Sequence, residues 1–232
     1  MCGLTGHDAS RAMRQGGKEM KKYRASWWRC GLVLMGAASW LPLAVPTGAQ
    51  AQMMATRNPA QVPAARYMLE PSHTQIEFAL SHMGFSTYYG RFGEASGWLD
   101  FVPAHPEASH LEITVPVSSL STTSPVLNQH LVGAEWFDVQ RWPVATFRST
   151  SARATGPDSG EITGDLTLHG ITRPVTLAVR FNGGGINPLS GRYTIGFEAR
   201  GNIRRSAFGI SRYLDMVGDD VQLIISAPFE KP

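Results

Sequence analysis

The chain has 232 residues and a formal net charge of +3, but the positive charge is concentrated near its start. From Met53 onward there are 14 Lys and Arg residues against 16 Asp and Glu residues, a net charge of −2. The net positive charge is therefore no reason to expect nucleic-acid binding. Both cysteines, Cys2 and Cys30, precede residue 52, so the remainder of the chain needs neither a disulfide nor a thiolate metal site.

The first 51 residues predict an upstream extension followed by a signal peptide. A positive segment over residues 21–24 precedes an apolar run over residues 30–41. That run is too short for a bilayer core, which takes about 20 apolar residues. Ala49-Gln50-Ala51 is an A-x-A cleavage site. We therefore expect export to the periplasm with cleavage before Gln52; an uncleaved membrane anchor is the alternative.

Residues 52–65 contain two prolines and no hydrophobic period, and they predict a flexible lead-in. From residue 66 to residue 232 we expect one domain, in which apolar residues recur at every second position between turn residues. This pattern is typical of antiparallel strands. The eight expected strands span residues 74–82, 89–101, 111–115, 145–152, 161–168, 175–181, 193–202 and 221–229.

One stretch departs from this period and predicts a short helix. Ser124 is a typical helix cap, Pro125 suits the first helical position, and Gly133 is suited to close the helix. Eight strands and one helix predict an all-β barrel or sandwich. A closed sheet of eight strands is either packed solid or holds one small ligand, and the pattern leaves both open.

Seven segments resemble the YceI-like family in chain order. The most diagnostic is GDLTLHGITRPV over residues 164–175, and WPVATF over residues 142–147 is also similar. The other segments lie at residues 67–78, 81–92, 118–122, 130–138 and 220–225. The resemblance implies an eight-stranded antiparallel lipocalin-like β-barrel in the periplasm. It further implies an elongated pocket for polyisoprenoid chains such as quinones or polyprenyl lipids, and it does not imply an enzyme.

The candidate ligand site has a wall and a mouth. The wall candidates are Phe78, Leu80, Phe85, Phe92, Trp98, Phe101, Trp136, Phe137, Phe147 and Phe208. For each of these, simple core packing is the alternative. His82, Tyr88 and Arg91 belong to a hairpin that would receive a quinone carbonyl or a phosphate at a barrel end. An exposed turn without a ligand is the alternative for this hairpin.

Motifs for catalysis and metal binding are missing from the sequence. It has no nucleophile elbow, P-loop or dinucleotide-binding fingerprint, and its histidines do not show metal-ligand spacing. We therefore expect a carrier of a hydrophobic small molecule, with no required cofactor, no catalytic residue, no metal and no stable membrane insertion of the mature chain. The alternatives are a filled barrel that binds an envelope protein, and a lipid- or glycan-acting hydrolase. The sequence leaves open whether the protein forms a homodimer.

Overall fold

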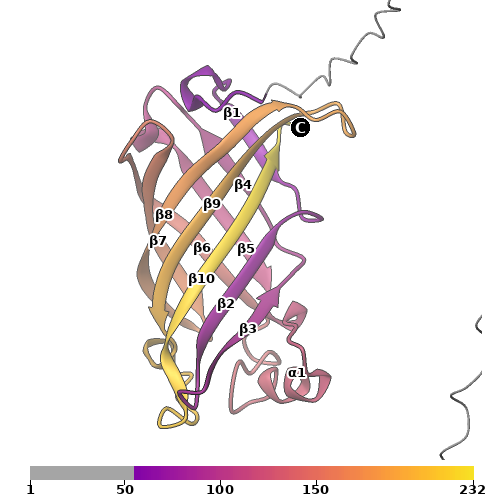
Figure 1. The fold of residues 1–232 in the computed structure, drawn as a ribbon, viewed down its shortest axis with the longest axis vertical. Coiled ribbons are helices and arrows are strands. Elements are labelled where there is room, and N and C mark those ends of the chain that lie inside the picture. The colour runs from indigo at the N-terminus through magenta and orange to yellow at the C-terminus, as the bar shows by residue number, and fades with distance from the viewer. Residues whose placement is uncertain (1–54) are drawn as a thin grey trace, which may run out of the picture. The chain divides into compact units, whose positions relative to one another are not determined.

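The computed structural model describes residues 55–232, and the predicted signal peptide lies outside these residues. Within them, ten strands form one antiparallel sheet in the order β1-β4-β5-β6-β7-β8-β9-β10-β2-β3, and β1 also pairs with β10 (Figure 1). The strands are β1 Ala65–Leu69, β2 Gln75–His82, β3 Ser86–Phe92, β4 Ser96–Phe101, β5 His110–Pro116, β6 Val144–Ala154, β7 Ser159–Leu168, β8 Ile171–Ile186, β9 Tyr193–Arg204 and β10 Val217–Glu230. The helices are α1 Pro125–Leu131 and the 3-10 turns η1 Pro59–Gln61, η2 Pro106–Ala108, η3 Val117–Ser119 and η4 Arg205–Phe208.

The sheet closes because β1 and β2 pair with different ends of β10. β1 pairs with Phe229 and Glu230, whereas β2 pairs with the stretch from Val217 to Ser226. β1 and β2 are therefore two halves of one barrel strand, and β3 and β4 divide the next strand in the same way. Counted in this way, the fold is the expected eight-stranded antiparallel barrel with one helix.

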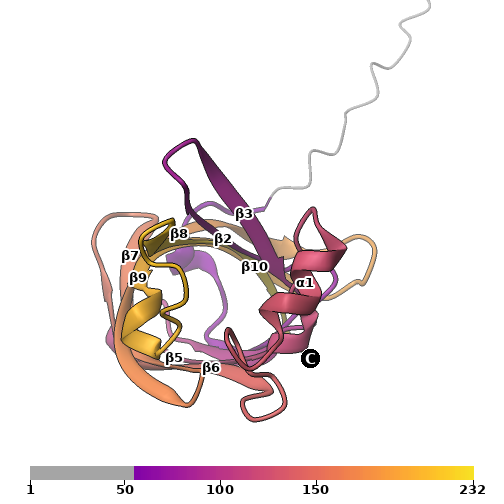
Figure 2. The ribbon, with the colours of Figure 1, turned by 90° about the horizontal axis from the view of Figure 1, so that it is seen from below.

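The expected strand over residues 89–101 is divided in the structure. Glu94 adopts a positive φ of 53°, which breaks the extended backbone between β3 and β4. Among the described strands, β3 pairs only with β2, which itself stays paired with β10, and the β2–β3 hairpin projects from the barrel (Figure 2). β1 was not marked by the periodicity, because its five residues contain only two buried side chains, Tyr67 and Leu69.

The lead-in, which its composition predicts to be flexible, makes several contacts with the barrel in the structure. From residue 55 it packs on the barrel, where Thr56 and Gly184 exchange two backbone hydrogen bonds of 2.8 and 2.9 Å. Val62 is only 3% exposed. The Tyr67 hydroxyl donates a hydrogen bond of 2.8 Å to the carbonyl oxygen of Pro63, and burial raises the pKa of Tyr67 to about 12. These contacts hold the segment over one end of the barrel, called the upper end below.

The opposite, lower end carries α1. Its first turn is capped as expected, since the Ser124 hydroxyl accepts a hydrogen bond of 3.3 Å from the backbone N–H of Leu127. Leu120 and Leu131, from this segment, are buried in one cluster with Phe78 and Val221 of the barrel. Figure 2 shows α1 at the lower end of the barrel. The helix segment thus fills part of the lower end of the barrel.

Candidate functional site

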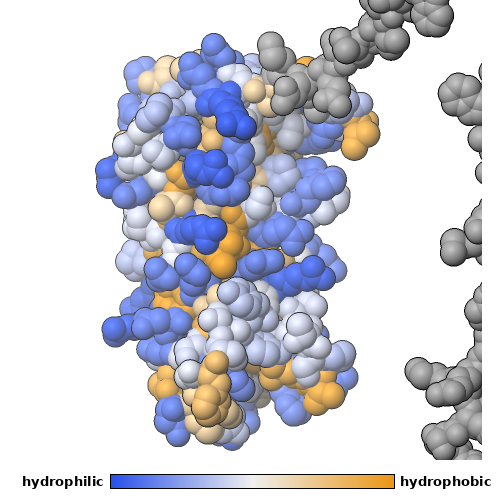
Figure 3. All heavy atoms as spheres, viewed as in Figure 1, coloured by the Kyte–Doolittle hydropathy of each residue, from blue (hydrophilic) through white to orange (hydrophobic). Residues whose placement is uncertain are grey.

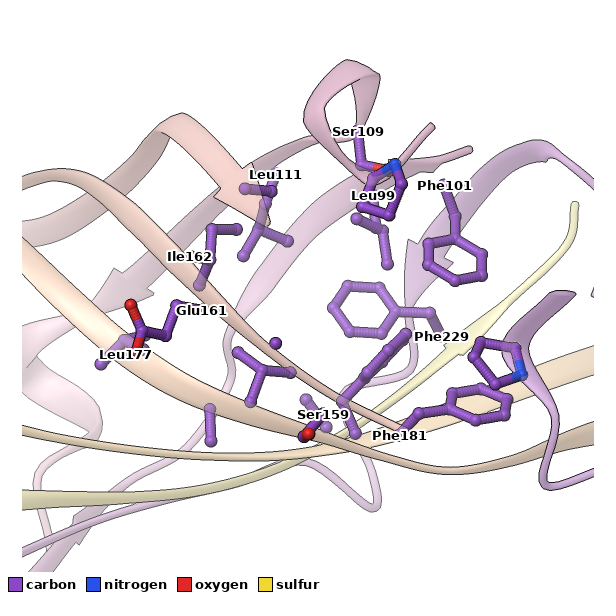
Figure 4. A pocket seen from close by; sticks show the side chains of 18 of the residues that line it. Leu99, Phe101, Ser109, Leu111, Ser159, Glu161, Ile162, Leu177, Phe181 and Phe229 are labelled. Carbon is purple, nitrogen blue, oxygen red and sulfur yellow. The ribbon is translucent and has the colours of Figure 1, made fainter. Parts of the chain in front are cut away.

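A cavity of about 450 Å³ lies inside the upper part of the barrel (Figure 4). Its lining is mostly aliphatic and aromatic, and it comes from almost every strand of the barrel. Residues labelled in Figure 4 include Leu99, Phe101, Leu111, Ile162, Leu177, Phe181 and Phe229. A cavity of this volume lies within the range of small-ligand sites, about 300–1,000 Å³.

Strand alternation explains why the lining is apolar. On β8, Val175 and Leu177 are buried whereas Thr176 and Ala178 are exposed. On β7, Ile162 is buried and faces the cavity. Because successive side chains of a strand point to opposite faces, one register directs every second residue inward. Figure 3 shows the result on the outside, where polar side chains cover much of the wall.

Four phenylalanines surround the upper part of the cavity. The ring of Phe197 lies 5.4 Å from that of Phe181, 5.7 Å from that of Phe101 and 6.2 Å from that of Phe229, measured between centroids. The Phe101 and Phe229 rings meet Phe197 edge to face, which is a favoured aromatic geometry. The four rings present an aromatic surface to any molecule in the cavity.

Two glycines keep the middle of the cavity wide. A Cβ atom at Gly164 would lie 2.5 Å from the Phe147 ring, and one at Gly201 would lie 2.5 Å from the Leu177 side chain. Both large side chains therefore lie against bare backbone on the neighbouring strand. They follow the wall instead of crossing the lumen, and this leaves space in the centre.

A second group of aromatic side chains packs at the lower end of the barrel, outside the cavity lining. The rings of Phe78 and Phe92 are 5.6 Å apart, and those of Phe92 and Phe137 are 5.7 Å apart with an edge-to-face geometry. The Phe78 ring lies directly over the backbone of Gly90, its cross-strand partner. Together with α1, these side chains close the lower end of the barrel.

Most polar groups near the cavity are engaged by the protein itself. The Thr74 hydroxyl donates a hydrogen bond of 2.7 Å to the carbonyl oxygen of Glu70, and the Ser109 hydroxyl accepts one of 2.9 Å from Val102. Partial burial raises the pKa of Glu70, but hydrogen bonds from Ser72 and His73 outweigh it and lower the pKa to about 2. The turn after β1 is thus built around a carboxylate.

The sequence-predicted wall residues divide into four groups. Phe101 and Phe147 line the cavity. Phe78, Leu80, Phe92, Trp136 and Phe137 belong to the lower cluster, whereas Phe208, in η4, is buried in a cluster with Ile162 and Leu177, which line the cavity. Phe85 and Trp98 do not face the interior.

The prediction that Phe85 and Trp98 belong to the wall is corrected by their positions in the structure. Phe85 is 88% exposed at the tip of the β2–β3 hairpin, beyond the end of the wall. Trp98 lies on the outer face, where the Arg66 guanidinium stacks 4.0 Å from its ring centroid. Trp98 and Phe101 are three residues apart on one strand, so they cannot both point inward.

The predicted mouth residues lie at the lower end, away from the cavity. The rings of His82 and Tyr88 contact each other at 5.8 Å. Arg91 is exposed, and its backbone exchanges hydrogen bonds of 2.9 and 2.8 Å with Ser121. The structure therefore brings these three residues near the plugged end, and none of them lines the cavity.

The rim of the cavity is formed by segments that the prediction did not single out. They are η1, the residues around η2 and the turn between β6 and β7, and they contribute four prolines, Pro59, Pro103, Pro106 and Pro157. The sequence signal was present as a cluster of turn residues at 103–106 and 156–160, but it did not reveal which barrel end each turn occupies.

Within residues 55–232, every helix is too short or too polar to span a bilayer. In the same residues, no group of three or more His, Cys, Asp or Glu side chains is placed to hold a metal ion.

Comparison with known proteins gives a consistent result. Residues 67–229 match the YceI-like domain family. Protein YceI of Salmonella arizonae is 38% identical over 165 residues, which cover 70% of this chain and 85% of that protein.

Two solved structures share the fold. Burkholderia cenocepacia BcnA superposes with a TM-score of 0.63 at 25% identity and covers 69% of this chain and 98% of its own. A polyisoprenoid binding domain from Saccharophagus degradans, described as implicated in plant cell wall breakdown, gives a TM-score of 0.54 at 16% identity, with 72% and 98% covered.

Proposed function

This chain belongs to the YceI-like domain family, and from that premise we propose that it is a periplasmic carrier that holds an isoprenoid-type lipid inside its barrel. The lipid would be a quinone or a polyprenyl lipid. The apolar cavity of about 450 Å³ is the observation that carries the proposal. The description of the Saccharophagus degradans domain as polyisoprenoid binding supports it.

The physical basis of binding is removal of the lipid tail from water. Each 100 Å² of apolar surface transferred into the cavity contributes about 2.5 kcal/mol. The rings of Phe101, Phe181, Phe197 and Phe229 provide such a surface without any specific polar bond. This chemistry suits a flexible, branched hydrocarbon better than a polar metabolite.

The proposed activity is sequestration without a covalent step. The described lining residues include no cysteine and no histidine that could activate a serine, and our proposal assigns no nucleophile and no general base. The sequence-predicted signal peptide supports the periplasmic location. In that compartment a soluble barrel would shield a lipid tail between its donor and its acceptor.

The test is to express the full chain in a bacterium and purify the exported protein without detergent. Native mass spectrometry and organic extraction should then show one bound species with the mass of a quinone or polyprenyl lipid. An empty protein that also fails to take up added farnesol or a short-chain quinone would contradict the proposal.

A pair of variants makes this test specific for the cavity. Ala199 lines the cavity on β9, so Ala199→Phe should occupy part of the lumen and lower lipid occupancy several-fold. Ala178 is exposed on the neighbouring strand β8, and Ala178→Phe adds the same side chain outside. Equal occupancy in the two variants would contradict binding in the lumen.

A further inference from the structure

Charged residues reach the cavity only at its upper rim. Among the lining residues that the structure describes, the charged ones are Arg153, Asp158 and Glu161, all in or beside the turn between β6 and β7. Below the rim the described wall is aliphatic and aromatic, apart from hydroxyl groups already bonded to the backbone. The polar end of a bound lipid would therefore meet its polar partners at this rim.

The charge of Arg153 is paired within the protein. It pairs with Glu161 across the two strands, with 2.5 Å between the guanidinium Nη2 and a carboxylate oxygen. Their neighbours Ala152 and Ile162 face the cavity, so alternation directs both charged side chains to the outside. In Figure 4 the Glu161 carboxylate lies away from the rings of Phe181 and Phe229.

Asp158 is the remaining charge at the rim. It is exposed in the β6–β7 turn, and its carbonyl oxygen accepts a hydrogen bond of 2.7 Å from the backbone N–H of Phe181. This bond fixes the turn beside one of the phenylalanines of the cavity. The charged residues that line the rim are therefore one paired cation, its partner anion and one further anion.

We propose that the rim selects lipids with an uncharged polar end, and that Asp158 is a specificity-determining residue that disfavours phosphate and diphosphate head groups. This inference rests on the proposed function, since it presupposes a lipid in the cavity. Phosphate recognition normally uses arginine or lysine with its charge available, and the described rim instead presents a carboxylate. A quinone or an alcohol pays no such electrostatic cost.

The experiment compares two probes that share one tail, farnesol and farnesyl phosphate, by calorimetric titration at low salt. The wild-type protein should bind farnesol about tenfold more tightly than farnesyl phosphate. Added salt should bring the two affinities closer together, because salt screens the exposed charges of the rim. Equal affinity for the two probes would overturn the inference while leaving the proposed function intact.

Variants test whether Asp158 causes the preference for farnesol. Asp158→Lys should reduce the preference for farnesol several-fold, and Asp158→Asn should give an intermediate value. The control Asp165→Lys makes the same charge change on the outer face of β7, away from the rim, and should leave the preference unchanged. Equal effects of Asp158→Lys and Asp165→Lys would overturn the role of Asp158. Failure of the wild-type protein to bind either probe would instead contradict the proposed function.

Discussion

The two ends of this barrel are built on the same strands but are closed in different ways. At the lower end, α1 and its flanking segments insert Leu120 and Leu131 among the barrel residues Phe78 and Val221. At the upper end, short proline-containing turns form a rim around a cavity of about 450 Å³. Strand alternation makes the interior apolar at both ends, so the two ends differ in the segment that covers them. The space inside each end of this barrel is therefore set by its connections more than by its strands.

Replacing Arg205, at the lower end, should have the largest effect on stability. Its guanidinium donates hydrogen bonds of 2.6–2.9 Å to the carbonyl oxygens of Val217, Arg212, Gly218 and Ile210, and it is only 4% exposed. Arg205→Ala would leave these buried acceptors without a partner. We expect the free energy of unfolding to fall by about 3–5 kcal/mol, as measured by urea titration.

The neighbouring arginine is the matched control. Arg204 is exposed and lies 3.6 Å from a carboxylate oxygen of Asp220, so Arg204→Ala should cost less than about 1 kcal/mol. A similar loss in both variants would mean that Arg205 does not organise the lower end.

Replacing Gly90, which lies against the Phe78 ring, should have an intermediate effect on stability. A Cβ atom at residue 90 would collide with the Phe78 ring, so Gly90→Ala should displace that ring from the lower cluster. We expect a loss of about 1–3 kcal/mol in thermal or urea unfolding. Gly93 has open space around its own Cβ position, and Gly93→Ala should be close to neutral. Neutral behaviour of Gly90→Ala would show that the lower end has room to repack.

The smallest expected effect concerns Glu70, beside the upper rim, and it depends on pH. The pKa of Glu70 is lowered from 4.5 to about 2 in the folded protein, so its ionised form stabilises the fold above pH 4.5. That contribution is lost as the pH falls from about 4.5 through about 2. Glu70→Gln should therefore cost about 1–2 kcal/mol at pH 7 and almost nothing at pH 2. A difference between wild type and Glu70→Gln that stays constant with pH would contradict this explanation.

The barrel could be predicted from the sequence because period-two alternation is a local signal. The same alternation would have placed Trp98 outside and Leu99 inside, had it been preferred over aromatic character. The position of the cavity could not be predicted in this way. It depends on which turns cover each end, and the packing of Leu120 and Leu131 into the lower end joins residues distant in sequence.

Arg205 illustrates the same limit at a single residue. In the sequence, Arg204-Arg205 indicates an exposed basic turn. The structure separates the two, because η4 turns Arg205 inward toward four backbone carbonyl groups while Arg204 stays exposed. Main-chain acceptors leave no mark in the sequence, and so this buried cation could only be found in the fold.

The most direct measurement is nuclear Overhauser spectroscopy of the protein with added farnesol. We expect cross-peaks from the farnesol tail to the methyl groups of Ile113 and Leu177, which line the cavity. Leu131, in the lower cluster, should show none. Cross-peaks to Leu131 without any to Ile113 and Leu177 would contradict a ligand site in the upper part of the barrel.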